Sequence, residues 1–547
     1  MKRREFLRIS TNKQSSEDLQ ADLRVVADVE PKGTLSRQDA AHLLRRFTMG
    51  PTFALIDEFT GITSAEAASK IIGDGRDHLD ENKWRLPDGK ELNWLDTVEQ
   101  HPRRTGSVDV RNIIEGRHNN RYTALLQWWL NLMAEEGESQ YSLGREKLTL
   151  FLAMIWNIEY TYDTEEVMPP PLLYRHNQKL RKLRVGDYKE IALEMTLDGA
   201  FLLYQGLNES KGNPGEVPNE NYMRELLELF TMGIANIDEE IPIYTENDIK
   251  EGSRVLTGWR VPAHQGEVRP NGYFETYFAP QFHDLGGKNV MKGTIPPRDE
   301  LDNTEFKVRE EEVKGLINII FTQKAVEISE FICEKIFLEF IYSDPNSLDR
   351  SFISQMAEVF RNSEFKLSSV YEFIIQTDYF YDDSLIGAMI QNPVEFVIGT
   401  ERALGIDYGN SRINDVNRLE MRLYDPPNVS GWTGYRTWIS TSTYPERALI
   451  FERILGKMKT DELIAFGEAT GQMNNFKSMV ENIYNLILPK PIKDDRLNPM
   501  IQFVKDQFSF QSDGEWSSIV QNDRNKASEA IKSAIGLVGI MPDINLS

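Results

Sequence analysis

Residues 218–233, PNENYMRELLELFTMG, are the stretch from which the fold is predicted most directly. Apolar residues recur at helical spacing and cover more than half of the circumference, so we expect a largely buried α-helix. Asn219 is a favourable N-cap, and Gly233 stands where a left-handed residue often ends a helix. The chain is therefore expected to fold around a central helix that has a capping signal at each end.

The polar residues of this helix are unusual for a buried element. At about 100° per residue, Glu220, Arg224 and Glu228 share one row, and Asn221 and Glu225 lie on the adjacent rows. Inside a mostly apolar helix such groups need an ion pair, water or a bound ligand. A structural ion-pair network and a ligand-binding or catalytic site both remain open.

The charge of the chain argues against some classes of partner. The 547 residues include 85 acidic and 62 basic ones, which gives a net charge of −23. A negative field of this size repels phosphate and argues against general nucleic-acid or anionic-membrane binding. No run of 18 apolar residues is present, so we expect no transmembrane segment. The single cysteine, Cys333, lies in an apolar run and is predicted to belong to the core.

The amino terminus carries a twin-arginine-like pattern. Arg3 and Arg4 precede Phe6 and Leu7, but polar residues follow where an export signal has its apolar segment. We therefore expect a cytoplasmic protein, or one that reaches the periplasm or envelope with a partner that carries its own signal. A fortuitous basic terminus is the other interpretation.

The overall pattern predicts a mainly α fold, a large irregular helical domain with long loops. Residues 1–34 are polar and expected to be poorly ordered, 35–457 form the helical domain with a loop-rich insertion at about 73–118, and 458–547 form a C-terminal helical extension. Helical periodicity returns at Tyr122, and a helix with Thr245 as its N-cap is expected to run to Arg260. Residues 261–305 are rich in Gly, Pro and aromatic residues, which predicts a loop or a short hairpin.

Two loops supply further candidate groups. Residues 282–288, FHDLGGK, place an imidazole, a carboxylate and an ammonium around a glycine pair that lets backbone approach a ligand. Residues 426–432, PPNVSGW, form a turn whose Trp432, with Trp438, would offer a stacking platform for a sugar or another flat ligand. The alternatives are an ordinary histidine–aspartate loop and tryptophans that close the edge of a core.

These patterns define two groups of candidate site residues. The candidate acid–base groups are Glu220, Glu225, Glu228, His283 and Asp284, and the candidate ligand contacts are Asn219, Asn221, Arg224, Trp259, Lys288, Asn428, Trp432 and Trp438. No cofactor is strongly implied; a divalent cation such as calcium or magnesium is an alternative for the carboxylates, because it takes oxygen ligands. The sequence contains no His-Glu-x-x-His pair, Walker loop, dinucleotide glycine fingerprint or Gly-x-Ser-x-Gly elbow.

Several landmarks occur in a characteristic order: residues 41–47 (AHLLRRF) with 50–51 (GP), 145–147 (REK), 219–230, 256–259 (LTGW), 282–288, 393–395 (PVE) with 402–405, and 426–432. In these landmarks the chain resembles the bacterial family catalogued as domain of unknown function 1800. The resemblance implies a bacterial protein, often with an export signal and often encoded beside a sulfatase-like partner family that has its own twin-arginine signal.

One departure from the family pattern bears on chemistry. After REK many members have a Trp-His-Asn-His-Phe run, where this chain has Leu152-Ala153-Met154-Ile155-Trp156. The missing histidines favour a non-catalytic or divergent member. We therefore expect a helical scaffold or accessory protein that works with an exported or envelope partner. The alternative is a hydrolase-like envelope enzyme acting on a polysaccharide or a sulfate or phosphate ester, with Arg224 or Lys288 contacting the anion.

Overall fold

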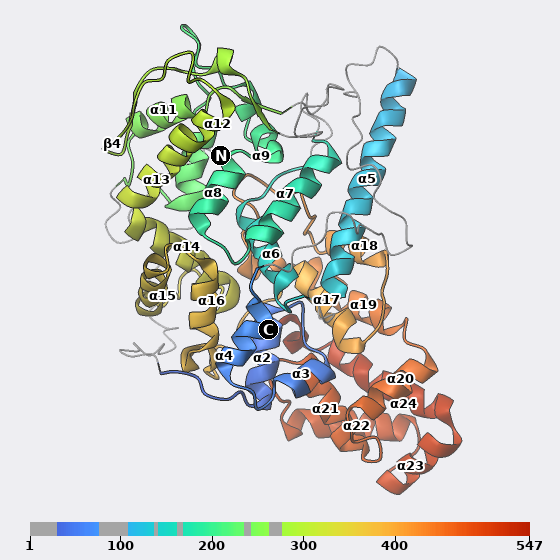
Figure 1. Cartoon of the computed structure of the whole chain (residues 1–547). Coiled ribbons are helices and arrows are strands. Elements are labelled where there is room, and N and C mark those ends of the chain that lie inside the picture. The colour runs from blue at the N-terminus through green and yellow to red at the C-terminus, as the bar shows by residue number, and fades with distance from the viewer. Residues whose placement is uncertain (1–29, 76–107, 136–140, 161–167, 235–241, 262–275) are drawn as a thin grey trace.

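The computed structural model describes residues 30–75, 108–135, 141–160, 168–234, 242–261 and 276–547 (Figure 1). These residues are mainly helical, which confirms the predicted fold class. The first part of the chain forms α2 (Arg37–Phe47), α3 (Phe53–Phe59), α4 (Ser64–Ile72), α5 (Val108–Ala134), α6 (Arg145–Ile155), α7 (Pro170–Leu183), α8 (Tyr188–Thr196), α9 (Gly199–Tyr204), η2 (Leu207–Glu209), α10 (Asn221–Glu225), η3 (Leu226–Thr231) and α11 (Glu246–Val255).

The middle of the chain contains the strands, and the remainder is again helical. The elements are β1 (Trp259–Arg260), β2 (Tyr277–Phe278), η4 (Pro280–Phe282), β3 (Lys288–Val290), β4 (Gly293–Ile295), α12 (Glu305–Lys307), η5 (Val308–Val313), α13 (Lys314–Gln323), α14 (Ala325–Phe340), α15 (Arg350–Asn362), α16 (Leu367–Ile375), η6 (Asp378–Tyr381), α17 (Pro393–Leu404), α18 (Ser411–Arg418), η7 (Tyr435–Trp438), α19 (Thr443–Leu455), α20 (Thr460–Ala469), α21 (Phe476–Ile487), α22 (Asp494–Gln507), α23 (Asp513–Asn522), α24 (Arg524–Gly539) and η8 (Pro542–Asn545).

Capping residues explain where several helices begin. Ser36, Thr245 and Asn392 each accept a hydrogen bond from the third residue of the helix that follows, namely α2, α11 and α17. The third residue is an acid in every case, and its carboxylate accepts from the backbone N–H of the cap. These capping boxes satisfy backbone donors that would otherwise lack partners.

The two small sheets are antiparallel pairs. Lys288 pairs with Ile295 in the β3–β4 hairpin, which confirms the short hairpin predicted within residues 261–305. Trp259 pairs with Phe278 across β1 and β2, so the end of the α11 segment lies beside the residues that precede the His283 loop.

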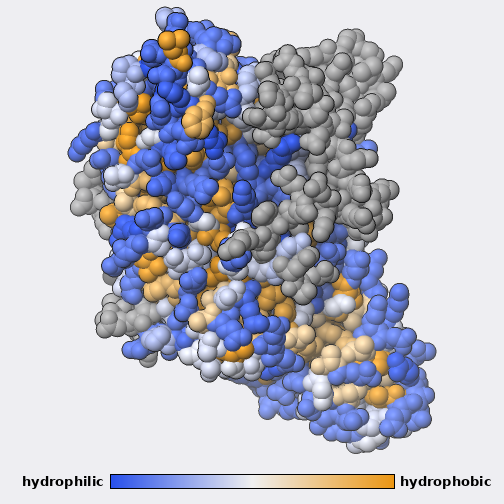
Figure 2. Space-filling model, viewed as in Figure 1, coloured by the Kyte–Doolittle hydropathy of each residue, from blue (hydrophilic) through white to orange (hydrophobic). Residues whose placement is uncertain are grey.

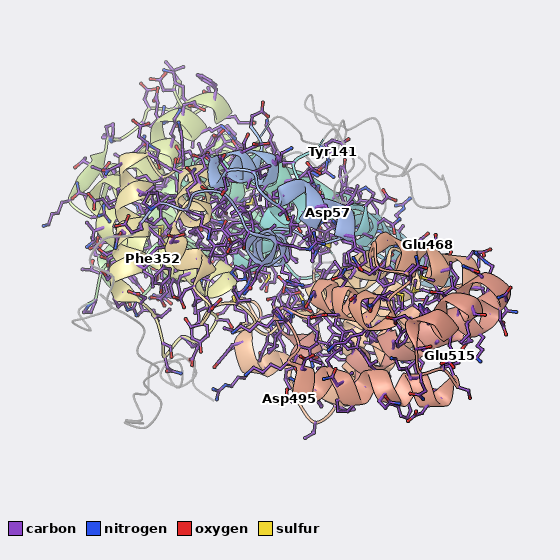
Figure 3. The ribbon with its side chains drawn as sticks, turned by 90° about the horizontal axis from the view of Figure 1, so that it is seen from below. Asp57, Tyr141, Phe352, Glu468, Asp495 and Glu515 are labelled. Atoms are coloured by element: carbon purple, nitrogen blue, oxygen red, sulfur yellow. The ribbon has the colours of Figure 1, made fainter. Side chains whose placement is uncertain are left out.

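The C-terminal helices α20–α24 pack around α24 and form a group at one end of the molecule (Figure 1). Figure 3 shows Glu468, Asp495 and Glu515 on this group and Phe352 of α15 on the opposite side. Arg45 joins the group to the first described helix, because its Nη2 donates to the Leu486 and Leu488 carbonyls, each 2.7 Å away, at the end of α21. The first described helix, α2, is therefore in direct contact with the end of α21 in the C-terminal group.

The central stretch differs from the uniform helix that its sequence predicts. The α-helix begins at Asn221, and from Leu226 the chain continues as a π-helix to Thr231. The Thr231 hydroxyl donates to the Leu226 carbonyl at 2.6 Å, a hydrogen bond that spans five residues. Gly233 has φ +81°, so its predicted left-handed conformation is confirmed.

Two other predicted boundaries are wrong. The α11 helix ends at Val255 rather than Arg260, because Gly258 has φ +87° and the chain then enters β1. The α5 helix begins at Val108 rather than near Tyr122, so the end of the predicted loop-rich insertion is helical. Residues 76–107 of that insertion and residues 1–29 lie outside the described residues. Among the helices the structure describes, none is both long and apolar enough to cross a membrane.

Candidate functional site

The exposed side of the central helix carries a network of ion pairs. The guanidinium of Arg224 binds the Glu246 carboxylate in two contacts of 3.1 and 2.7 Å, and lies 3.8 Å from the Glu228 carboxylate. Tyr244 donates its hydroxyl hydrogen to Glu228, and both burial and this contact raise the pKa of Tyr244. Arg224 and Glu228 are thus engaged with residues at the start of α11.

The remaining polar residues of the helix lie at its start and on its inner face. The Asn219 side chain accepts from the Asn221 backbone N–H at 2.9 Å and donates to the Gly206 carbonyl at 2.9 Å. Glu220 is half-buried beside them, whereas Glu225 is 1% exposed on the buried side. The asparagines therefore fix the helix start against the turn that follows α9.

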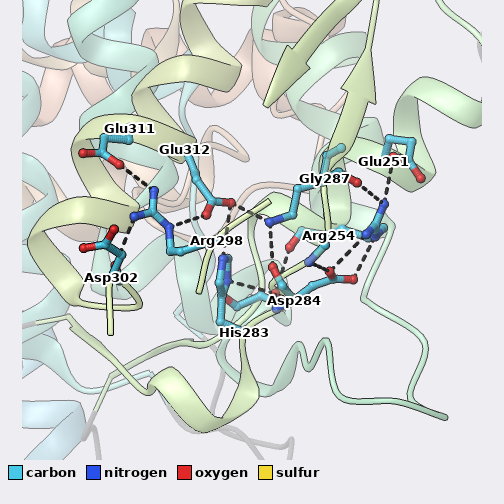
Figure 4. A network of polar contacts seen from close by, with 12 residues as sticks. Glu251, Arg254, His283, Asp284, Gly287, Arg298, Asp302, Glu311 and Glu312 are labelled. Carbon is cyan, nitrogen blue, oxygen red and sulfur yellow. Dashed lines mark hydrogen bonds and ion pairs between the residues drawn. The ribbon is translucent and has the colours of Figure 1, made fainter. Parts of the chain in front are cut away.

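The His283 loop is organised by a residue that the sequence does not single out, Glu312 of η5 (Figure 4). Its carboxylate accepts from Lys288 Nζ at 2.6 Å and from Arg298 Nε at 2.7 Å, and lies 3.3 Å from His283 Nε2. The other ring nitrogen, Nδ1, lies 2.9 Å from the Thr257 carbonyl oxygen. Both nitrogens of the ring therefore face oxygen acceptors, and both can donate when the ring is protonated.

The charge distribution of this cluster keeps Glu312 ionised. Burial would raise the pKa of Glu312, but the hydrogen bonds and charges of His283 and Lys288 lower it to about 2. Burial lowers the pKa of Lys288, whose charge the Glu312 carboxylate stabilises. A carboxylate with such partners is a stable anion at neutral pH.

Asp284 belongs to an adjoining set of contacts. Arg254 binds its two carboxylate oxygens at 2.8 and 3.0 Å, and the Gly286 N–H donates to it at 2.8 Å. The Arg254 hydrogen bonds and charge oppose the effect of burial and lower the pKa of Asp284. A Cβ on Gly286 would lie 2.5 Å from Arg254 Nη2, so the space opened by this glycine is occupied by the arginine.

The two sets of predicted acid–base groups lie at opposite ends of α11. Arg224 of the central helix contacts Glu246 at its first residue, and Asp284 contacts Arg254 in its last turn. Eight residues of α-helix separate these contacts by about 12 Å. The structure therefore does not bring the central helix and the His283 loop together in one constellation. Among the described residues, no group of three or more His, Cys, Asp or Glu has the arrangement of a metal site.

The PPNVSGW turn packs on the end of α6. Gly431 has φ +80°, and a Cβ there would lie 3.0 Å from the Met154 carbonyl oxygen. Asn157 donates from Nδ2 to the Val429 carbonyl at 3.1 Å. Asn428 is exposed, and its side chain accepts from Ser430 N at 2.8 Å, which shapes the turn. The turn thus closes the carboxyl end of α6.

The predicted tryptophans have different environments. Trp432 is half-buried and lines a small hollow together with Trp129, Trp156, Asn157, His176 and Tyr424. Trp438 is buried in η7, and Trp259 is buried with its ring centroid 5.3 Å from that of Phe278. Of the three predicted tryptophans, Trp432 is the one that lines this hollow.

The sequence profile of a family described as "Protein of unknown function (DUF1800)" matches residues 42–542. The chain belongs to this family. The DUF1800 match begins within α2 and ends in η8, so it includes the C-terminal helices. No curated protein and no solved structure matches the chain.

The DUF1800 landmark at residues 145–147 forms another buried network. Glu146 accepts from Arg181 Nε at 2.9 Å and Nη2 at 2.8 Å, and from Arg145 at 2.8 Å. Burial would raise the pKa of Glu146, but the charges and hydrogen bonds of Arg181 and Arg145 lower it to about 2. Lys147 pairs with Glu395 of the 393–395 landmark, so two distant landmarks meet in one ion pair.

Sequence reasoning missed Glu312 and its partner Arg298, and it also missed Arg254, which binds Asp284. Glu312 stands last in a run of three glutamates, and nothing in the sequence distinguishes it from Glu310 and Glu311. The distinction comes from the π-helix η5, in which Glu312 is buried while Glu311 is exposed. A search of the sequence for acidic residues near a predicted buried helix face would have returned Glu312, but together with Glu310 and Glu311 and without a reason to prefer it.

Proposed function

We propose that the protein is a scaffold or accessory protein that binds a partner protein through the turn at residues 298–307, which we call the Leu301 turn. The observation that carries the proposal is the exposure of Leu301 and Phe306, at 90% and 74%, on a turn that is anchored to the buried Glu312. The groups that anchor the turn, Arg298 and Glu312, pair with each other, as is typical of a contact that supports the fold.

The Leu301 turn is rigidly constructed. The Asp299 carboxylate accepts from the backbone N–H groups of Leu301 and Asp302, each at 2.9 Å. Arg298, held by Glu312, donates from Nη1 to the Asp302 carbonyl at 3.0 Å. A preorganised apolar side chain loses little conformational entropy on binding, so such a turn favours association.

The surroundings of the turn indicate the chemistry of the partner. Asp299, Glu300 and Glu305 flank the two apolar side chains, and all three are half-buried or exposed. Figure 2 shows this end of the molecule, near α11 and α12, as largely hydrophilic with a few apolar residues standing out. A complementary partner surface would have an apolar pocket with a basic rim.

Affinity purification of the tagged chain from its source cells, with mass spectrometry of the bound material, tests the proposal. We expect a stoichiometric partner whose recovery falls about 30-fold in Leu301→Ser/Phe306→Ser, the effect of losing about 2 kcal/mol at an interface hot spot. Phe503→Ser is the matched control, since Phe503 is 55% exposed on α22 in the C-terminal group of helices. Equal recovery by both variants, or no stoichiometric partner, would contradict the proposal.

The route to an exported partner is a separate part of the proposal. A sulfatase-like neighbour with its own twin-arginine signal is the partner that the family resemblance implies. If the chain's own arginines are read for export, replacing Arg3 and Arg4 by Lys will change its fractionation. Unchanged fractionation, together with co-fractionation of the partner, would support export by the partner.

The hydrolase-like alternative relies on groups that the structure places in internal contacts. His283 faces Glu312, and Asp284 faces Arg254. Glu225→Gln with His283→Ala tests this alternative, because it removes two of the candidate acid–base groups. If every phenotype persists while circular dichroism shows an intact fold, these residues perform no catalysis.

A further inference from the structure

The loop between η2 and α10 carries another exposed apolar side chain. Val217 is 82% exposed, and it lies in residues 211–218, which we call the Val217 turn. Figure 1 shows α9, which precedes this loop, and α12, which ends the Leu301 turn, near the same end of the molecule. The two turns are therefore candidates for a common binding surface.

The Val217 turn is held in one shape by its backbone. Glu216 N donates to the Asn213 carbonyl at 3.0 Å, and this hydrogen bond closes a four-residue turn. Pro214 is the second residue of that turn, and Gly215, with φ +93°, is the third, which is the arrangement of a type II turn. An apolar side chain on such a preorganised turn loses little conformational entropy when a partner binds it.

Both turns are fastened to the same short helix, η4. The Asn303 side chain of the Leu301 turn donates to the Pro280 carbonyl at 2.9 Å. The Asn213 side chain of the Val217 turn donates to the Gln281 carbonyl at 2.7 Å. Two consecutive carbonyl oxygens of η4 therefore hold the two turns next to each other.

The apolar tips of the turns are close enough to share one partner. Leu301 is two residues from Asn303, a stretch of chain that spans at most about 7 Å. The β-turn keeps the Cα atoms of Asn213 and Glu216 within about 7 Å, and Val217 follows directly. A standard protein interface, with about 800 Å² on each partner, is roughly 30 Å across. Both tips can therefore lie under one partner.

The free charges of the two turns are mainly negative. Glu216 and Glu300 are exposed, and no ion pair among the described residues includes either of them. The cations of the Leu301 turn, Arg298 and Lys307, are bound by carboxylates of this chain. Lys211 of the Val217 turn faces an aromatic ring and has no carboxylate partner in the described ranges. A partner with basic residues complements this distribution.

We propose that the Val217 turn and the Leu301 turn together form one docking surface for a folded basic protein, whose apolar cleft receives Val217, Leu301 and Phe306. A cleft is required, because these side chains are 82%, 90% and 74% exposed and are buried only by a partner that surrounds them. Lysine or arginine residues at the edge of the cleft pair with Glu216 and Glu300. This inference rests on the proposed function and adds to it a second contact segment and a cleft that spans both turns.

Photo-crosslinking of the full chain in its source cells tests whether one partner covers both turns. The photoreactive residue p-benzoylphenylalanine replaces Val217, Leu301 or, as a control, Val326, which is 51% exposed on α14. We expect the same partner polypeptide to be crosslinked from positions 217 and 301 but not from position 326, with both crosslinks in one cleft flanked by lysine or arginine. Different partners at the two positions, or equal crosslinking from position 326, would overturn the inference.

Substitutions distinguish the failure of this inference from the failure of the proposed function. Val217→Ser should lower recovery of the crosslinked partner about tenfold through the loss of one buried apolar side chain, whereas Val217→Ile and the control Val326→Ser should retain it. If Leu301→Ser/Phe306→Ser loses the partner and Val217→Ser retains it, the inference fails and the proposed function stands. If the partner is retained by both, or lost with Val217→Ser alone, both fail.

The charge of the partner is tested by Glu216→Lys. We expect recovery to fall about fivefold at about 0.05 M salt and much less at about 0.5 M salt, where screening weakens contacts between exposed charges. Glu468→Lys is the matched control, because Glu468 is exposed in the C-terminal group of helices (Figure 3). Equal recovery by the two variants at low salt would overturn the assignment of a basic partner.

Discussion

Replacing Glu312 by Gln removes the charge that stabilises the Leu301 turn while keeping the size of the side chain. Glu312 is 1% exposed and Lys288 is fully buried, so the substitution leaves a buried ammonium without its carboxylate. Breaking a buried ion pair in this way costs about 3–5 kcal/mol of unfolding free energy. We therefore expect a large loss of unfolding free energy, although the substitution replaces only one carboxylate oxygen by an amide nitrogen.

The pKa of Glu312 gives an independent magnitude. Its folded value of about 2 compares with a usual value of 4.5, and a difference of about 2.5 at about 1.4 kcal/mol each corresponds to about 3 kcal/mol. Because the folded pKa is the lower one, this contribution is fully present above pH 4.5 and is lost as the pH falls towards 2. The penalty of Glu312→Gln should therefore shrink to about 1 kcal/mol at pH 3.

Urea unfolding followed by tryptophan fluorescence at pH 7 and pH 3 measures both effects. Glu311→Gln is the matched control, because Glu311 lies next to Glu312, pairs with the same Arg298 and has a 56% exposed side chain. An exposed pair of this kind contributes less than about 1 kcal/mol. Equal losses for the two variants at pH 7 would refute the assignment of Glu312 as the anchor of the cluster.

Three further substitutions and one measurement of thiol reactivity test local packing and ion pairing. Gly286→Ala should destabilise by about 1–3 kcal/mol in thermal unfolding, because its Cβ meets Arg254, whereas Gly315→Ala, with nothing within 4 Å, should stabilise by up to about 1 kcal/mol. Cys333 is buried and burial raises its thiol pKa, so it should react with a thiol reagent only after unfolding. Glu246→Ala should cost less than about 1 kcal/mol, because the Glu246 side chain is 77% exposed, and chemical denaturation measures this loss.

Helix type and many helix starts could be predicted because they depend on neighbours in the sequence. Thr245 is such a case, since its hydroxyl and the Asp248 carboxylate form a capping box within four residues. The π-helices could not be predicted in this way. Leu226–Thr231 has an ordinary helical pattern, and the wider hydrogen bonding is apparent only where the Thr231 hydroxyl meets the Leu226 carbonyl.

The composition of the candidate site was harder to predict than its location. The sequence identified His283, Asp284 and Lys288 as neighbours, and the structure shows all three in polar contacts, of which those of His283 and Asp284 can be followed in Figure 4. Their main partners, Glu312 and Arg254, lie 29 and 30 residues from His283 and Asp284. Such contacts depend on the packing of α11 and η5, and local spacing contains no information on that packing.

The buried arginines give a physical reason for several family landmarks. Arg45 donates to carbonyls at the end of α21, Arg46 donates to the Leu385 carbonyl at 2.7 Å, and Arg402 donates to the Gly50 carbonyl at 3.2 Å. A guanidinium has five donors in a fixed plane and can serve several carbonyls, whereas the lysine ammonium is a compact point charge. These landmark arginines hold distant segments of backbone together. Their presence in a DUF1800 protein therefore does not by itself indicate catalysis.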